Sequence, residues 1–121
     1  MSELNIEIKK TGENNEICVA VPKGSIDTYT LPIFQNAIEG LIKEECQKLI
    51  VDFGSADFIS SAGMGFLITT LGELQSHGGD IKLSGMSSDV YEMFELLGLD
   101  NVFRILTNQQ EAVEDFQKGV N

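Results

Sequence analysis

Two adjacent serines, Ser60 and Ser61, have the surroundings in this sequence that point most directly to chemistry. They precede Gly63 and Gly65, and a glycine in a helix costs about 1 kcal/mol relative to alanine. Such a cost is tolerated where a backbone must approach another group closely. The N-terminus of a helix also carries partial positive charge and unpaired N–H groups, so it can hold a phosphate. The segment could therefore accept a phosphoryl group, although a serine here can also serve only as an N-cap.

Two aspartates are further candidates. Asp27 precedes the first predicted helix, so we expect it at the same sheet edge as Ser61, where α/β folds place ligands. Capping of that helix is its alternative role. Asp52 ends a buried strand and could be a phosphoacceptor, as in receiver domains. That chemistry needs an acidic pair for magnesium, which Glu3 and Glu7 do not supply.

Other catalytic arrangements are not indicated. The single histidine, His77, precedes two glycines at a predicted helix end, where it is favourable as a C-terminal cation. No Ser-His-Asp, Cys-His or GxxxxGK[ST] arrangement is present. Cys18 and Cys46 form no CxxC pair, which predicts free thiols in a reducing compartment. We therefore expect no enzyme activity, no metal and no cofactor.

The charge balance restricts the partners. Eight basic residues against 19 acidic ones give a net charge of -11, which repels nucleic acid and anionic membrane surfaces. The charge suits a partner with a basic patch and favours a monomer. Residues 1–10 lack the apolar core of a signal peptide, and no apolar run approaches the ~20 residues of a membrane-spanning helix. We expect a soluble, cytoplasmic protein.

The elements that must position these residues alternate between strands and helices. Alternating apolar residues predict strands over 4–8 and 17–21 that form a hairpin, with Pro22 ending the second strand. Further strands are predicted over 48–53, 81–83 and, as a short or extended segment, 102–106, with a loop over 54–57. One helix is predicted to begin near Thr28 or Thr30 and a second at about Ala62. Ser87 or Ser88 is predicted to cap a third helix, and Thr107 pairs with Gln110 in a capping box for a fourth.

The order β-β-α-β-α-β-α-β-α predicts an α/β fold. We expect a single domain over residues 1–121, with a mixed sheet of four to five strands covered by about four helices.

Three motifs carry a family resemblance. The run Phe58–Leu67, FISSAGMGFL, resembles the signature of STAS domains, specifically of bacterial anti-sigma factor antagonists. The segment Gly24–Asp27, GSID, resembles the family's Gly-x-Leu/Ile-Asp before the first helix, and Leu96–Phe103 resembles its stretch after the third helix. The motifs stand in the family's order and span nearly the whole chain.

The resemblance implies a protein-binding switch. Ser61 matches the serine that the partner, an anti-sigma factor and serine kinase, phosphorylates, and Asp27 matches the acidic residue beside it. The unphosphorylated form binds the anti-sigma factor and frees the sigma factor; phosphorylation blocks docking, and a metal-dependent serine phosphatase restores it. Ser60 stands where the family often has Asp, which creates a second possible acceptor. The docking surface expected around Ser61 comprises Asp27, Thr28, Ser60, Ala62, Gly63 and Met64.

Alternative functions remain open at this point. The helix start could hold an anionic metabolite or nucleotide in a phosphotransfer or small-ligand domain. The chain could also be a structural partner in a signalling assembly with Ser61 only a cap, or a STAS module that controls a target other than a sigma factor.

Overall fold

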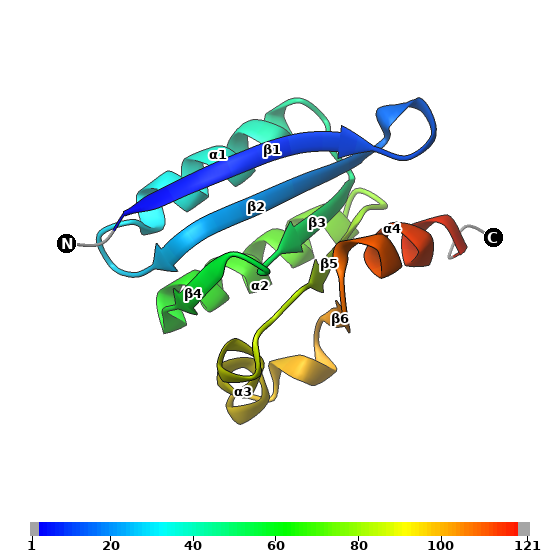
Figure 1. Cartoon of the computed structure of the whole chain (residues 1–121). Coiled ribbons are helices and arrows are strands. Elements are labelled where there is room, and N and C mark those ends of the chain that lie inside the picture. The colour runs from blue at the N-terminus through cyan, green and yellow to red at the C-terminus, as the bar shows by residue number, and fades with distance from the viewer. Residues whose placement is uncertain (1–2, 119–121) are drawn as a thin grey trace.

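The computed structural model describes residues 3–118 as a mixed sheet with helices on both faces (Figure 1). The strands are β1 (Leu4–Thr11), β2 (Ile17–Ile26), β3 (Lys48–Asp52), β4 (Ala56–Ile59), β5 (Asp80–Ser84) and β6 (Arg104–Leu106). The helices are α1 (Leu31–Lys43), α2 (Ser61–Gln75), α3 (Ser88–Leu96) and α4 (Gln109–Lys118), with short 3-10 turns η1 (Glu13–Asn15) and η2 (Leu99–Asn101). The predicted α/β fold is confirmed.

The sheet has the order β1-β2-β3-β5-β6, with β4 paired to β2 beside this path. The predicted hairpin is confirmed, since β1 is antiparallel to β2; the other pairs are parallel. Strand β4 lies partly in the segment predicted as a loop. It forms because β3 pairs with β2 only as far as Ala20, which leaves the second half of β2 open to residues 56–59.

The expectation that Pro22 ends the second strand is wrong, because β2 continues to Ile26. Pro22 lies opposite Ile6 of β1. On its other side it falls in the interval between the pairing of Ala20 with β3 and that of Gly24 with β4. Proline has no N–H, and at this position neither β3 nor β4 offers a carbonyl group with which a backbone N–H would pair. The strand can therefore continue through Pro22.

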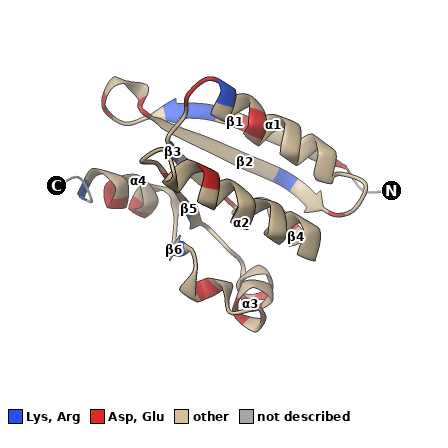
Figure 2. Ribbon diagram, turned by 180° about the vertical axis from the view of Figure 1, so that it is seen from behind, with Lys and Arg blue, Asp and Glu red and all other residues tan. Residues whose placement is uncertain are grey.

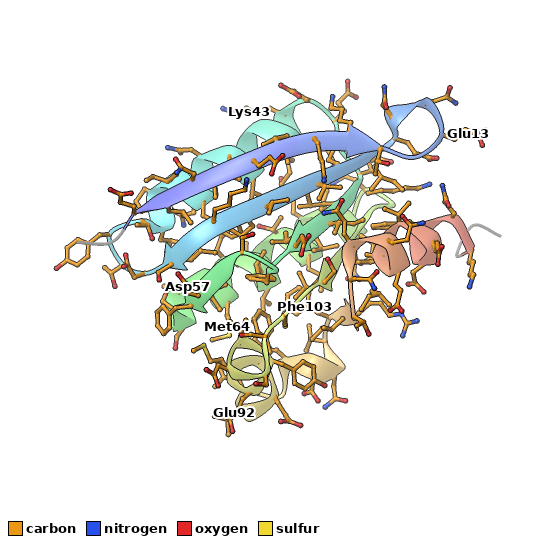
Figure 3. The ribbon with its side chains drawn as sticks, viewed as in Figure 1. Glu13, Lys43, Asp57, Met64, Glu92 and Phe103 are labelled. Atoms are coloured by element: carbon orange, nitrogen blue, oxygen red, sulfur yellow. The ribbon has the colours of Figure 1, made fainter. Side chains whose placement is uncertain are left out.

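Apolar side chains divide the molecule into layers. Helices α1, α2 and α3 cover one face of the sheet and share a large buried cluster, which includes Phe34, Leu67 and Phe94. Helix α4 covers the other face, where Ala112 and Phe116 pack on strand residues (Figures 1 and 2). Figure 3 shows Glu13, Lys43, Asp57 and Glu92 projecting from the surface, whereas Met64 and Phe103 belong to the large cluster.

Ionic contacts hold α4 to the sheet. The carboxylate of Asp115 accepts hydrogen bonds from Lys82 Nζ of β5 at 2.6 Å and from Arg104 Nε and Nη2 of β6 at 3.1 and 3.0 Å. Lys82 Nζ also lies 4.7 Å from the centre of the Phe116 ring, a cation–π contact. Hydrogen bonds first from Arg104 and then from Lys82 lower the pKa of Asp115 to about 2. The negatively charged form of Asp115 is therefore the form that stabilises this contact.

Within residues 3–118, no helix has the length and apolar character needed to cross a membrane.

Candidate functional site

The two serines occupy different positions at the N-terminus of α2. Ser60 is the N-cap residue, with extended backbone angles, and its Oγ accepts a hydrogen bond from the N–H of Gly63 at 3.1 Å. Ser61 is the first helical residue and is exposed. No hydrogen bond joins its hydroxyl to another residue in the described part of the chain. The capping role thus belongs to Ser60, and the hydroxyl of Ser61 faces solvent at the positive end of a helix dipole.

Gly63 is the residue that allows α2 to start where it does. A methyl group placed at its Cα would lie 2.9 Å from Cγ1 of Ile59 and 3.2 Å from Cγ2 of Ile26, so the helix backbone packs directly on the ends of β4 and β2. The predicted close approach is confirmed there. It is wrong for Gly65, which is exposed and has open space where a Cβ would stand.

Asp27 organises the turn between β2 and α1. Its Oδ1 accepts hydrogen bonds from the N–H groups of Tyr29 and Thr30 at 2.9 and 3.0 Å and lies 3.2 Å from the hydroxyl oxygen of Thr30. Thr30 occupies the N-cap position but makes no side-chain cap; its hydroxyl donates instead to the carbonyl oxygen of Ser25 at 2.7 Å. Asp27 is therefore half-buried and fixed in place by the turn that it stabilises.

The pairing of β2 with β4 brings the two motifs together. Ile26 pairs with Ile59, and the N–H of Ser60 donates to the carbonyl oxygen of Ile26 at 2.8 Å. Asp27 follows Ile26 directly, and Ser61 follows Ser60. The structure thus places Asp27 and Ser61 at the ends of two neighbouring parallel strands, at the same edge of the sheet.

The predicted docking residues divide into exposed and buried ones. Thr28 and Ala62 are exposed, like Ser61, and Ser60 is half-buried. Gly63 and Met64 are buried, Met64 to 4 % exposure, so the expectation that they form part of a surface is wrong for this structure. Both residues face inward because the first turn of α2 packs on the strand ends. Their contribution is to position the helix.

Exposed apolar residues near these motifs were missed from the sequence. Tyr29 is 88 % exposed and adjoins Thr28, Ile33 on the first turn of α1 is 47 % exposed, and Phe58 of β4 is 38 % exposed. Tyr29 could have been suspected because an aromatic residue stands between two threonines in a polar turn. Helix α2 itself carries almost no charge, with Glu73 as the acidic residue within it (Figure 2). This edge therefore offers a weakly charged, partly apolar surface.

The remaining candidates have structural contacts. Asp52 Oδ1 accepts from the N–H of Gly54 at 2.9 Å and its Oδ2 from Nε2 of Gln109 at 2.8 Å. Among the described residues no group of three or more His, Cys, Asp or Glu side chains could hold a metal ion. His77 is exposed, and its Nδ1 lies 3.0 Å from the carbonyl oxygen of Glu73. Cys18 and Cys46 are buried cysteines, and neither forms a disulfide within the described residues.

The sheet, its helices and the serine-bearing helix start define a single α/β domain of one known type. A family model described as "STAS domain" matches residues 6–112. The chain belongs to the STAS domain family.

Similar proteins agree with that family. The chain is 29 % identical over 103 residues to the anti-sigma-B factor antagonist of Listeria monocytogenes, which covers 84 % of this chain and 88 % of the relative. A crystal structure of an anti-sigma factor antagonist from Mycobacterium paratuberculosis matches with a TM-score of 0.86 at 19 % identity, covering 95 % of both chains. The anti-sigma factor antagonist SpoIIAA in its unphosphorylated form matches with a TM-score of 0.79 at 21 % identity, covering 97 % of this chain and 100 % of that one.

Proposed function

We propose that the chain is an anti-sigma factor antagonist controlled by phosphorylation of Ser61. Its unphosphorylated form binds an anti-sigma factor that is also a serine kinase, and this binding releases a sigma factor. Phosphorylation of Ser61 prevents the binding, and a metal-dependent serine phosphatase restores it. The chain acts in this scheme as a binding protein in the cytoplasm, and not as an enzyme. The names of its relatives support the class of function.

The observation that carries the proposal is the division between the serines. The Ser60 hydroxyl oxygen caps α2, while the Ser61 hydroxyl is exposed at the first helical position, at the same sheet edge as Asp27. Ser61 is therefore the proposed acceptor, and Ser60 is not.

Electrostatics account for the switch. A phosphate adds about −1.5 to −2 charges at neutral pH. The chain already carries a net charge of -11, and the exposed surface around Ser61 is weakly charged and partly apolar. A partner that docks there would have to desolvate or oppose the new charge, which disfavours binding. The proposed contact surface comprises Asp27, Thr28, Ser60, Ser61 and Ala62, together with Tyr29.

The test uses the cognate anti-sigma factor and three variants. Ser61→Asp is expected to weaken binding by about tenfold or more, because it places a charge inside the interface. Ser61→Ala is expected to bind like the wild type and to resist inactivation by ATP. Ser88→Asp is the matched control, since Ser88 is the exposed first residue of α3 and follows the N-cap Ser87. Equal binding by Ser61→Asp and wild type would contradict the proposal.

A further inference from the structure

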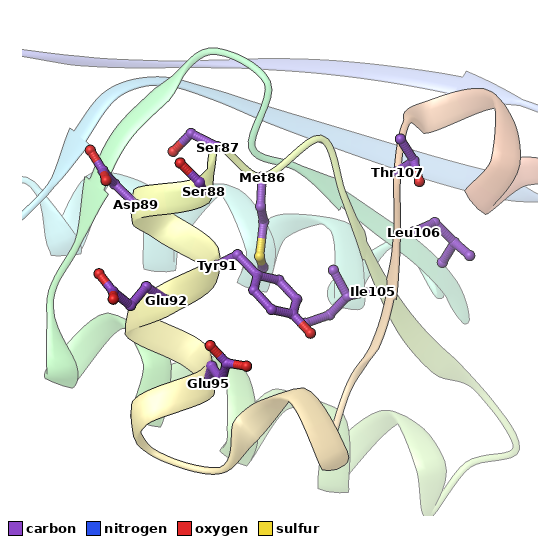
Figure 4. Close-up of a pocket in the computed structure, with 10 residues that line it drawn as sticks. All are labelled: Met86, Ser87, Ser88, Asp89, Tyr91, Glu92, Glu95, Ile105, Leu106 and Thr107. Carbon is purple, nitrogen blue, oxygen red and sulfur yellow. The ribbon is translucent and has the colours of Figure 1, made fainter.

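A groove between α3 and β6 is not used by the proposed function. It has a volume of about 800 Å³ and opens to solvent. Figure 4 shows the side chains of Met86 and Tyr91 on the side of α3 that faces β6, with the Tyr91 ring directed toward Ile105. The floor of this α3–β6 groove can therefore bury apolar groups of a partner.

One wall of the α3–β6 groove is acidic. Asp89, Glu92 and Glu95 follow one another at intervals of three residues on α3, so they lie along one side of the helix. All three are exposed, and none forms an ion pair within residues 3–118. None of the described residues that line the groove is Lys, Arg or His.

The single arginine of the sequence does not neutralise this wall. Arg104 precedes Ile105 in β6, and successive side chains of a strand point to opposite faces. The guanidinium of Arg104 is bonded to Asp115 of α4, on the opposite face of the sheet from α3. The α3–β6 groove therefore keeps an apolar floor beside uncompensated negative charge.

We propose that the α3–β6 groove binds a basic, amphipathic segment of a partner protein. The segment's apolar side chains would contact Tyr91, Met86 and Ile105, while its Lys or Arg side chains would pair with the carboxylates of α3. The charge selects this occupant among the alternatives. A second copy of the chain, with a net charge of -11, is repelled, and so are nucleotide phosphates and anionic lipid.

This surface is separate from the one around Ser61. The groove is lined by residues within 86–95 and 105–107, and none of them belongs to the contact surface proposed around Ser61. We expect binding in the groove not to depend on the state of Ser61, so the two proposals can fail separately.

The experiment titrates the full-length, ¹⁵N-labelled protein with a synthetic helical peptide that has Leu on one face and Lys and Arg on the other. We expect the largest NMR shift changes at Met86, Tyr91 and Ile105. Glu92→Lys combined with Glu95→Lys should weaken binding about tenfold, since attraction becomes repulsion. Tyr91→Ala should weaken it by a similar factor through loss of the apolar contact, and Tyr91→Phe should retain it.

A charge-matched control separates a specific site from general attraction. Glu39→Lys combined with Glu73→Lys changes the net charge equally, at exposed positions of α1 and α2. This control and Ser61→Asp should both leave the affinity within about twofold of wild type. The proposal would be overturned if both double variants lost the same affinity for the peptide, or if the NMR shift changes lay away from the groove. Equal binding of a peptide with Glu in place of Lys and Arg would overturn it as well. So would saturable binding of ATP at the same residues.

Discussion

The Oγ of Ser60 accepts a hydrogen bond from the backbone N–H of Gly63 at 3.1 Å. This contact gives different roles to two neighbouring serines, either of which could have capped the helix on sequence grounds. The first closes the end of α2, and the second presents its hydroxyl to solvent one residue later. The same contact fixes Gly63 against the strand ends, so the geometry of the proposed acceptor depends on both residues.

Replacement of Ser60 by alanine is expected to lower the free energy of unfolding by about 1 kcal/mol, because the helix loses its cap. Ser61→Ala should change it by less than about 0.5 kcal/mol, since Ser61 is exposed and makes no such bond. Urea denaturation followed by circular dichroism measures both values. An equal cost for the two variants would show that the serines share the capping role.

Gly63 and Gly65 form a second matched pair. Gly63→Ala should destabilise the domain by roughly 1–3 kcal/mol, because the new methyl group overlaps Ile59 and must shift the helix or the strand. Gly65→Ala should stabilise it by up to about 1 kcal/mol, since the site is open and alanine favours a helix. Thermal unfolding of the two variants provides the comparison. A stabilised Gly63→Ala would mean that α2 does not pack as closely as described.

The contact between Asp115 and the sheet predicts a pH dependence. Its pKa is about 2 in the folded state, below the ordinary value of 3.8, so the unfolded chain binds the proton more readily. The stabilisation is complete above about pH 4 and is lost as the pH falls toward 2. Asp115→Asn should therefore cost about 1 kcal/mol near pH 6 and almost nothing near pH 2.

The control for this prediction is Glu114→Gln. Glu114 is exposed and accepts one hydrogen bond, from Gln110 on its own helix. The free energy of unfolding of the Glu114→Gln variant should follow that of the wild type across the same pH range. A cost of Asp115→Asn that is unchanged at low pH would mean that charge is not the origin of the stabilisation.

The buried Cys46 thiol should be unreactive in the folded protein. Burial, and then a hydrogen bond with Cys18, raise the pKa of Cys46 to about 12, so very little thiolate is present at pH 8. Reaction with a thiol reagent at pH 8 should be slow in buffer and rapid in guanidinium chloride. Cys18→Ala removes the second thiol and isolates the signal of Cys46. Rapid modification of the folded Cys18→Ala variant would contradict the burial of this residue.

Local signals in the sequence were sufficient for most of the fold. The apolar spacing of residues 34–42 gave the buried face of α1, and Ser87 was one of the two predicted caps for α3, where its Oγ accepts from the N–H of Val90. Gly98, in a left-handed conformation, ends α3 as predicted. Each of these features depends on residues within a few positions of one another, which is why a single sequence reveals them.

Features that depend on tertiary contact were not predictable in this way. Strand β4 forms because β2 is longer than β3, and the extent of β2 was hidden by Pro22. The cap of α4 is also shifted by one residue from the predicted Thr107 and Gln110, since Asn108 Oδ1 accepts from the N–H of Glu111. At the candidate site, α2 begins at Ser61, close to the predicted start at about Ala62, and this start makes Ser60 the N-cap.

Tyr29 is expected to be an anchor for the partner in the proposed function. Its ring is 88 % exposed, yet its backbone N–H is held by Asp27, so the side chain is presented from an ordered turn at the edge that carries Ser61. Exposed aromatic residues of this kind often dominate the energy of a protein interface. Tyr29→Ala should therefore leave the free energy of unfolding unchanged and weaken binding to the anti-sigma factor by about tenfold or more. Tyr91→Ala, an aromatic truncation in the α3–β6 groove, is the matched control, and equal effects of the two variants on this binding would rule out a specific role for Tyr29.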